Sequence, residues 1–454
     1  MGHPLRWLAL FGISILAFTA FLDFTIVNTA LPFIKKAFRA NVLQLQWVSN
    51  IFSMVLATTM LAVGRIADLH GRKKVFYAGV GIFGIAALCA GFSPSIYFLA
   101  FFRGLQGLGA SILFVSSASL ISDAFPKEEQ GKAIGIYSGI TGLGLAIGPV
   151  VGGFLVQLLS WKWVFWVNLP LILIGLPICH FTLKVPPHVK QDAKIDWKGV
   201  VLLMAGLGSL IYGIIHAARA GWTAAAWIFL CAGLALLILF VYTERKTAHP
   251  LIDFSIFKEK LIVLGTLSVC AAGVVSYVFM FFYPLYLENV RNLSAMQIGI
   301  WIAAIPVAQV AISFGFGPLL KRFGIEYLLV ISTAAAFLAV FLHYFIGAKT
   351  PLGLILIPFA ILGVNWGISN AGQISAVSQS VPPAKVGAAM GSVMTIWNVF
   401  GSISLAISAA IFHSHLDKSF LDAFHSMVDF NILFTLLILI ASLAVIGYSR
   451  KTQK

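Results

Sequence analysis

The stretch FTAFLDFTIVNTALP, residues 18–32, places one carboxylate, Asp23, in a run that otherwise carries no charge. Most of this run lies in an apolar segment, residues 7–31, and about 20 such residues are enough to cross a bilayer as a helix. Thirteen further segments of this kind follow, and only 10% of the 454 residues are charged, against about 25% in soluble proteins. The sequence therefore predicts an all-α polytopic membrane protein.

Two other classes are excluded by the pattern and the charge. The strands of a membrane barrel alternate apolar and polar residues over segments of about ten, and these runs do not alternate. The formal charge of +15 fits the excess of Lys and Arg in cytoplasmic loops, so no nucleic-acid partner is expected. The cysteines show no paired spacing and are interpreted as small apolar residues: Cys89, Cys179, Cys231 and Cys270.

Charge also predicts the orientation. With the N-terminus inside, the inner loops and termini hold 21 Lys and Arg and the outer loops hold 8, so both termini are expected in the cytoplasm. Lys35, Lys36 and Arg39 would lie outside and do not fit this rule. The fourteen spans are expected at 7–31, 47–64, 75–92, 96–119, 133–159, 163–181, 199–217, 223–243, 261–287, 298–317, 326–346, 352–375, 388–412 and 428–448.

The spans are arranged as six, then a pair, then six. This order predicts an N-terminal six-helix bundle (1–184), a central linker with two extra helices (185–260) and a C-terminal six-helix bundle (261–454). The loop GRIADLHGRKK (64–74) after the second span is echoed by GPLLKRFG (317–324) after the tenth. Two related bundles favour a site between them near the middle of the membrane.

The loop at 64–74 has the residues of a conformational latch. Glycine allows a tight turn at a helix end, and an aspartate there accepts from backbone N–H groups or pairs with a cation. A loop that is merely basic and cytoplasmic is the alternative. The predicted latch residues are Gly64, Asp68, Gly71, Arg72 and Lys73.

The fourth span carries a full charge in RGLQGLGAS, residues 103–111. A charged side chain within a span costs at least about 3 kcal/mol and faces a cavity or a partner. Arg103 is therefore a candidate functional residue, and Gln106 adds a hydrogen-bonding group one turn away.

The fifth span carries GLGLAIGPVVGGFL, residues 142–155. Gly144, Gly148 and Gly152 recur every four residues and form a small-residue face, with Gly153 beside it. Pro149 removes a backbone donor and kinks the helix. A general helix-packing face is the alternative interpretation.

These motifs, with WKWVFWVNLP (161–170), resemble the fourteen-span drug:proton antiporter branch of the major facilitator superfamily over residues 18–170. The latch of that superfamily usually has a basic residue where this chain has Leu69. In the C-terminal half the resemblance depends on the number of spans and the loop echo. It implies alternating access, a proton gradient as the energy source without a cofactor, and the plasma (inner) membrane of a bacterial cell.

Asp23 is the one acidic residue well inside a span, and the span 1 motif of this branch carries an aspartate there. Asp23 and Arg103 are each expected roughly 10–12 Å below the outer ends of their spans, at 1.5 Å per residue. Burial favours a protonated carboxyl group and a nearby cation favours the ionised one, so movement of helices could switch it. We expect the two residues to pair and Asp23 to couple transport to protons; a purely structural pair or a solvated carboxylate is the alternative.

A single cavity carboxylate beside an arginine favours neutral, zwitterionic or weakly anionic amphiphiles over dications as substrates. Apolar walls with a few polar groups suit such ligands, although each such residue could instead make a helix–helix contact. The predicted cavity residues are Gln106, Gln309, Asn365, Trp366, Trp397 and Asn398.

Other functions are weighed against export. An enzyme or an ATP-driven pump is not expected, because the sequence has no HExxH, no second buried carboxylate and no nucleotide loop. A dedicated exporter of one metabolite, such as a siderophore or peptide, and a facilitator without proton coupling remain alternatives. The expected partners are the lipid bilayer and a small amphiphilic substrate, and periplasmic or outer-membrane partner proteins cannot be read from the sequence. No metal site is expected, and the histidines His216 and His343 are expected at the membrane interface.

Overall fold

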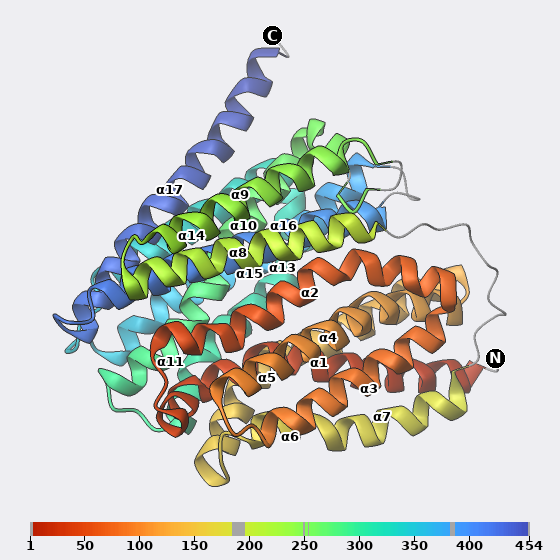
Figure 1. Cartoon of the computed structure of the whole chain (residues 1–454). Helices are drawn as coiled ribbons and strands as arrows, with labels where there is room; N and C mark the ends of the chain where they lie inside the picture. The colour runs from red at the N-terminus through yellow and green to blue at the C-terminus, as the bar shows by residue number, and fades with distance from the viewer. Residues whose placement is uncertain (1–2, 184–195, 248–249, 253, 382–385, 453–454) are drawn as a thin grey trace. The chain divides into compact units, whose positions relative to one another are not determined.

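The computed structural model describes residues 3–183, 196–247, 250–252, 254–381 and 386–452, and this part of the chain contains helices and no strands (Figure 1). The first helices are α1 (His3–Phe38), α2 (Val42–His70), α3 (Arg72–Gly91), α4 (Ile96–Ala124), α5 (Lys127–Leu158), α6 (Trp163–Trp166), α7 (Asn168–Thr182), α8 (Trp197–Ala220) and α9 (Ala224–Glu244). The remaining helices are η1 (Phe254–Lys258), α10 (Lys260–Val274), η2 (Val275–Phe279), α11 (Met280–Asn289), α12 (Ala295–Ile302), α13 (Ala304–Phe323), α14 (Ile325–His343), α15 (Leu352–Ser380), α16 (Val386–Ser414) and α17 (Phe420–Thr452).

The predicted helical membrane fold is confirmed. Thirteen segments in the described part of the chain are long and apolar enough to cross a membrane, and α2 covers the remaining predicted span at 47–64. Helices suit this environment because every backbone polar group inside a bilayer must be paired within the protein. Three of the predicted spans consist of consecutive pieces, namely α6–α7, α10–η2–α11 and α12–α13.

Contacts divide the chain into two compact units. The first unit contains Met1–Val200 and Ser294–Ile300, and the second contains Val201–Leu293 and Trp301–Lys454. The predicted domain boundary at residues 184–185 lies outside the described residues, and the three-part division stays a prediction.

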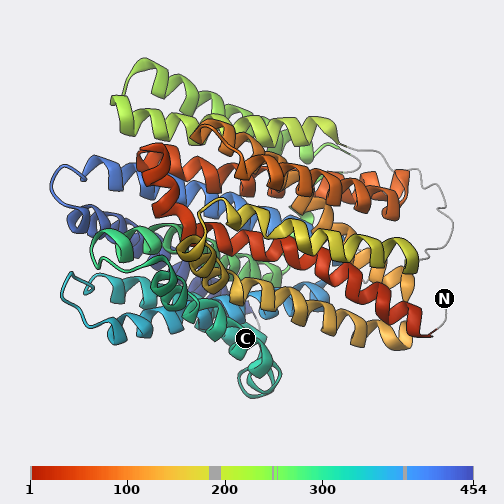
Figure 2. The same ribbon diagram turned by 90° about the horizontal axis from the view of Figure 1, so that it is seen from below.

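In the first unit, α1 packs against α4, α5 and α7, while α2 and α3 pack on α4. Figure 2 shows α1 (red) running between α7 (yellow) and α5 (orange). Glycine allows the close approach of α2 and α4, because a Cβ at Gly107 would overlap the backbone of Phe52. A capping box starts α2: the Asn41 side chain accepts from the backbone N–H of Gln44 at 2.8 Å, and the Gln44 side chain accepts from that of Asn41 at 3.0 Å.

In the second unit, α10 packs against α14, α15, α16 and α17. The span that begins with α10 changes to a π-helical turn at η2, and such turns are common at functional sites. The hydroxyl of Ser276 in this turn donates to the carbonyl of Ala272 at 2.5 Å. The ring of Tyr277 lies where a Cβ on Gly401 would be, so the absence of a side chain there lets α16 approach the turn.

Candidate functional site

The structure brings Asp23 of α1 and Arg103 of α4 together inside the first unit. Arg103 donates through Nη1 to Oδ2 of Asp23. Asp23 has no solvent exposure and Arg103 has 2%. Breaking such a pair is costly, because the remaining charge would be buried without a partner. This ion pair therefore links α1 to α4 in the interior of the first unit.

Arg103 makes further contacts with its surroundings. Its Nε donates to the carbonyl of Val48 on α2 at 3.1 Å, and its Nη1 also donates to Oε1 of Gln106 at 3.0 Å. Its guanidinium lies 4.2 Å from the centre of the Phe52 ring, a cation–π geometry. The planar guanidinium, with its several donors, can make these contacts simultaneously, whereas a lysine ammonium cannot.

The second carboxylate oxygen of Asp23 accepts from two amides. Nε2 of Gln106 and Nδ2 of Asn168 each lie 3.2 Å from Oδ1 of Asp23. Gln106, which was predicted for the substrate cavity, is therefore part of the ion-pair cluster. Asn168 is the first residue of α7, and sequence reasoning recognised it only as a motif residue. An amide in the apolar run WVNLP was the signal that it faces a polar partner.

The electrostatics of this cluster are simple. The stretches packed around α1 at 42–64, 96–121, 139–158 and 163–179 contain one charged residue, Arg103, and no Asp, Glu, Lys or His. The pair is therefore neutral as a whole, and its carboxylate accepts hydrogen bonds from Arg103, Gln106 and Asn168. Protonation of Asp23 would remove the charge attraction that holds Arg103.

The glycine face of α5 lies against α1, as the helix-packing interpretation of the sequence requires. A Cβ on Gly144 would meet the backbone of Phe18, and a Cβ on Gly152 would lie 2.8 Å from the carbonyl oxygen of Ile26. Gly148 lies against the Thr25 hydroxyl, and Gly153 against the backbone of Ala295 in the same unit. Pro149 is inside α5, as predicted. These contacts join α5 to α1, the helix that carries Asp23, and the kink at Pro149 stays a prediction.

Two of the predicted latch cations connect helix ends in the first unit. Nη1 of Arg72 lies 2.8 Å from Oδ1 of Asp123 near the end of α4, and Nζ of Lys73 donates to the carbonyl of Leu183 at 2.6 Å. Gly71 has a φ of 95°, a conformation that favours glycine. The side chains of Asp68 and Leu69 lie outside the described residues. Asp123 was not predicted as a latch partner.

Gly64, the remaining latch residue, lies beside α4, where a Cβ would be 3.5 Å from Cγ1 of Val115. That is an ordinary van der Waals distance, so this position does not require glycine for space. Its role in the latch stays a prediction.

The predicted cavity residues of the second unit are found in different contacts. Nδ2 of Asn365 on α15 donates to the carbonyl and hydroxyl of Ser332 on α14, both at 3.0 Å, and Ser369 joins this buried cluster. Asn365 therefore connects two helices, which was the alternative interpretation. Its role toward substrate stays a prediction.

Tyr277 contacts both predicted cavity residues of α16, Trp397 and Asn398. Its hydroxyl donates to Oδ1 of Asn398 at 2.5 Å, and its ring meets that of Trp397 edge to face at 5.8 Å. Gln309 and Trp366 are both buried, at 7% and 4% exposure. None of these contacts joins the predicted residues into a single wall within the described part of the chain.

His343, which was predicted to lie at the membrane interface, is the last residue of α14, and its side chain is buried in the second unit with no solvent exposure. The centre of its ring lies 4.5 Å from that of Phe279 and 5.1 Å from that of Tyr283. Its Nδ1 is hydrogen-bonded to the carbonyl of Ala339. Tertiary packing of the second unit, which no local pattern reveals, buries this end of α14.

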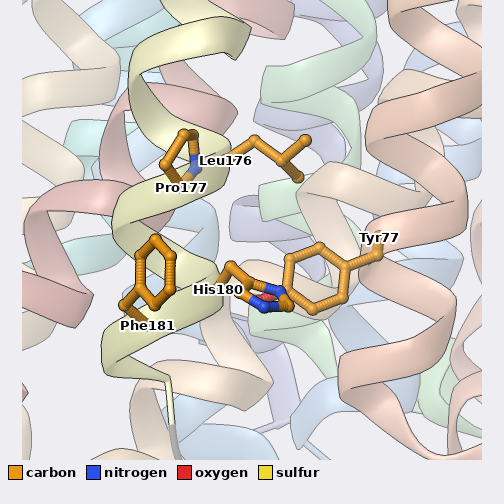
Figure 3. A pocket seen from close by; sticks show the side chains of 5 residues that line it. All are labelled: Tyr77, Leu176, Pro177, His180 and Phe181. Atoms are coloured by element: carbon orange, nitrogen blue, oxygen red, sulfur yellow. The ribbon is translucent and has the colours of Figure 1, made fainter.

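An apolar pocket of about 360 Å³ lies between α3 and α7 in the first unit (Figure 3). Tyr77 of α3 and the side chains of α7 line it, and none of them belongs to the Asp23 cluster. The lining residues are Tyr77, Leu176, Pro177, His180 and Phe181.

The sequence of this chain matches a family model and several known transport proteins. The family model described as Major Facilitator Superfamily matches residues 13–203 and 197–405. The multidrug resistance protein Stp of Mycobacterium tuberculosis (strain CDC 1551 / Oshkosh) is 29% identical over 415 residues, which cover 88% of this chain and 76% of Stp. The riboflavin transporter RibZ of Clostridioides difficile (strain 630) is 30% identical over 417 residues, which cover 91% of this chain and 89% of RibZ.

Among solved structures, a peptide transporter POT in complex with sulfate superposes with a TM-score of 0.72 at 14% identity. The match covers 96% of this chain and 94% of that one. At this identity the likeness concerns the fold alone.

Proposed function

This chain belongs to the Major Facilitator Superfamily, and from that premise we propose that it exports small amphiphilic compounds in exchange for protons. Membership makes it a transporter and not an enzyme. The relative Stp is named as a multidrug resistance protein, which supports a drug-exporter-like activity. The proposed location is the plasma membrane of a bacterial cell, since the relatives named above are bacterial.

The observation that carries the proton coupling is the buried pair of Asp23 and Arg103. A coupling group must bind a proton in one conformation and release it in another. In this structure the Asp23 carboxylate accepts hydrogen bonds from the Arg103 cation and from two amides, those of Gln106 and Asn168. Protonation would neutralise Asp23, weaken the link between α1 and α4, and leave Arg103 with its contacts to Val48 and Gln106. Protonation of Asp23 would thus allow α1 and α4 to move relative to each other.

The proposed substrates are neutral, zwitterionic or weakly anionic amphiphiles. Asp23 already has a cationic partner, so it offers little attraction for a second cation. The same argument disfavours dications, which would require several free carboxylates in the cavity. A second candidate, the dedicated transport of one compound, is favoured by the similarity to RibZ, which is named for a single compound.

The test uses purified protein in proteoliposomes with an internal pH dye. A proton gradient is imposed, a panel of amphiphiles is added, and wild type is compared with Asp23→Asn. Substrate-dependent proton flux in wild type that is lost in the variant is the expected result. Equal substrate movement in both proteins without proton flux would show a facilitator, with Asp23 as a structural partner of Arg103.

A further inference from the structure

Asn168 holds the ion-pair cluster from a third helix. Its Nδ2 donates both to Oδ1 of Asp23 and to the carbonyl of Phe165, each at 3.2 Å. The side chain has no solvent exposure, and its Oδ1 has no hydrogen-bond partner within the described part of the chain. A carboxylate only accepts hydrogen bonds, so the amide must turn its nitrogen toward Asp23 while Asp23 is ionised.

The two amides beside Asp23 differ in what their oxygens do. Oε1 of Gln106 accepts from Arg103 and is fixed by it. Oδ1 of Asn168 is buried and unused, an arrangement that is costly unless another state uses it. A protonated Asp23 would be such a state, because a carboxylic acid donates one hydrogen bond and needs an acceptor.

We propose that Asn168 is a positioning residue that sets the proton affinity of Asp23 by serving both of its protonation states. In the ionised state Nδ2 donates to Asp23, as observed. When a proton from the aqueous phase binds to the carboxylate, a half-turn of the amide presents Oδ1 as the acceptor of the new O–H. Arg103 keeps its own protons throughout. The half-turn gives up the bond to Phe165, so the amide favours the ionised state until the proton arrives.

This proposal builds on the proposed function but can be tested separately from it. Arg103 is the one charged residue in the surrounding stretches, so a change in the donors to Asp23 should be visible in its titration. The carbonyl band of protonated Asp23 is identified by infrared difference spectroscopy as the band that disappears in Asp23→Asn. Its intensity is then followed against pH in detergent-purified protein.

In Asn168→Leu, half-protonation of Asp23 should occur at a pH higher by about one unit, a tenfold gain in proton affinity, because the ionised form loses a donor. Asn168→Ala also removes the amide and should shift the titration in the same direction, so it serves if Asn168→Leu does not fold. Asn28→Leu is the matched control, because Asn28 donates to the carbonyl of Phe24 in its own helix at 3.2 Å. It should leave the titration in place.

The results separate the two proposals. An unchanged titration in both Asn168 variants would overturn the role of Asn168, whether or not transport is coupled to protons. A shifted titration together with an absence of proton flux in wild-type proteoliposomes would support that role and reject the proposed function. In the transport assay, the pH dependence of the Asn168 variants should move with the titration, whereas a merely structural role would lower activity equally at every pH.

Discussion

Thr25 on α1 donates its hydroxyl to the carbonyl of Leu145 on α5, at 3.2 Å. Leu145 lies four residues before Pro149, so its carbonyl lacks the helical hydrogen bond that a proline nitrogen cannot donate. The hydroxyl therefore takes the place of the missing donor. The stretch of α5 around Pro149 is thus connected to α1 only two residues from Asp23, the acidic member of the ion pair.

Replacing Thr25 with valine should destabilise the protein by about 1 kcal/mol, because it removes a partly buried hydrogen bond to the Leu145 carbonyl. Valine keeps the shape of threonine, so packing changes little. The measurement is the unfolding temperature of detergent-purified protein.

Pro149→Ala provides the check on this explanation. It restores a backbone N–H that can reach Leu145, so adding it to Thr25→Val should recover most of the lost stability. In the wild-type background, where Thr25 already donates to Leu145, the same change should stabilise the protein much less. Thr266→Val is the control, since Thr266 donates to Ile262 within its own helix. Equal losses in Thr25→Val and Thr266→Val would contradict a special role for the Leu145 bond.

The close approach of α5 to α1 predicts a sharp difference between two glycines of α5. A Cβ on Gly152 would lie 2.8 Å from the backbone oxygen of Ile26, whereas one on Gly142 would have no atom within 4 Å. Gly152→Ala should therefore cost about 1–3 kcal/mol of stability by overpacking and reduce transport. Gly142→Ala should preserve both properties. Similar stability and transport in the two variants would show that α1 and α5 are not in close contact in the working protein.

The helices could be predicted from the sequence because apolar runs of sufficient length have few other structures available in a membrane. Their ends were less predictable. The span expected at 47–64 is part of a longer helix, α2, over 42–70. The capping box at Asn41 starts the helix earlier, and the first residues of the predicted loop at 64–74 continue it to His70. The π-helical turn at η2 contains Tyr277, which packs against α16, and no local pattern in the sequence predicted the turn.

The site was predictable to the extent that charge is costly in the membrane. Asp23 and Arg103 are the charged residues well inside spans, and equal depth was enough to pair them. Asn168 and Asp123 were missed as partners for a different reason. An amide or a helix-end acid is common in membrane proteins, and its partner depends on helix rotation, which the sequence alone does not define.

The pair of Arg72 and Asp123 should contribute more to transport than to stability. Both side chains are partly exposed, at 33% and 26%, so the pair is worth at most about 1 kcal/mol. Arg72→Asp and Asp123→Arg should each lower the rate of transport with a small change in unfolding temperature. The double exchange should recover part of the rate, because it restores opposite charges. A double variant as inactive as the single ones would indicate that the arginine is required for another contact.

Removing one member of the buried pair should be worse than removing both. Arg103→Gln leaves an ionised or newly protonated Asp23 buried without its cation and should cost about 3–5 kcal/mol. Adding Asp23→Asn should restore much of that stability, since no uncompensated charge remains. Transport should stay absent in the double variant, because the proton-binding group is gone. Thermal unfolding and proteoliposome flux are measured on wild type, Arg103→Gln, Asp23→Asn and the double variant. Recovery of proton-driven transport in the double variant would exclude Asp23 as the coupling carboxylate.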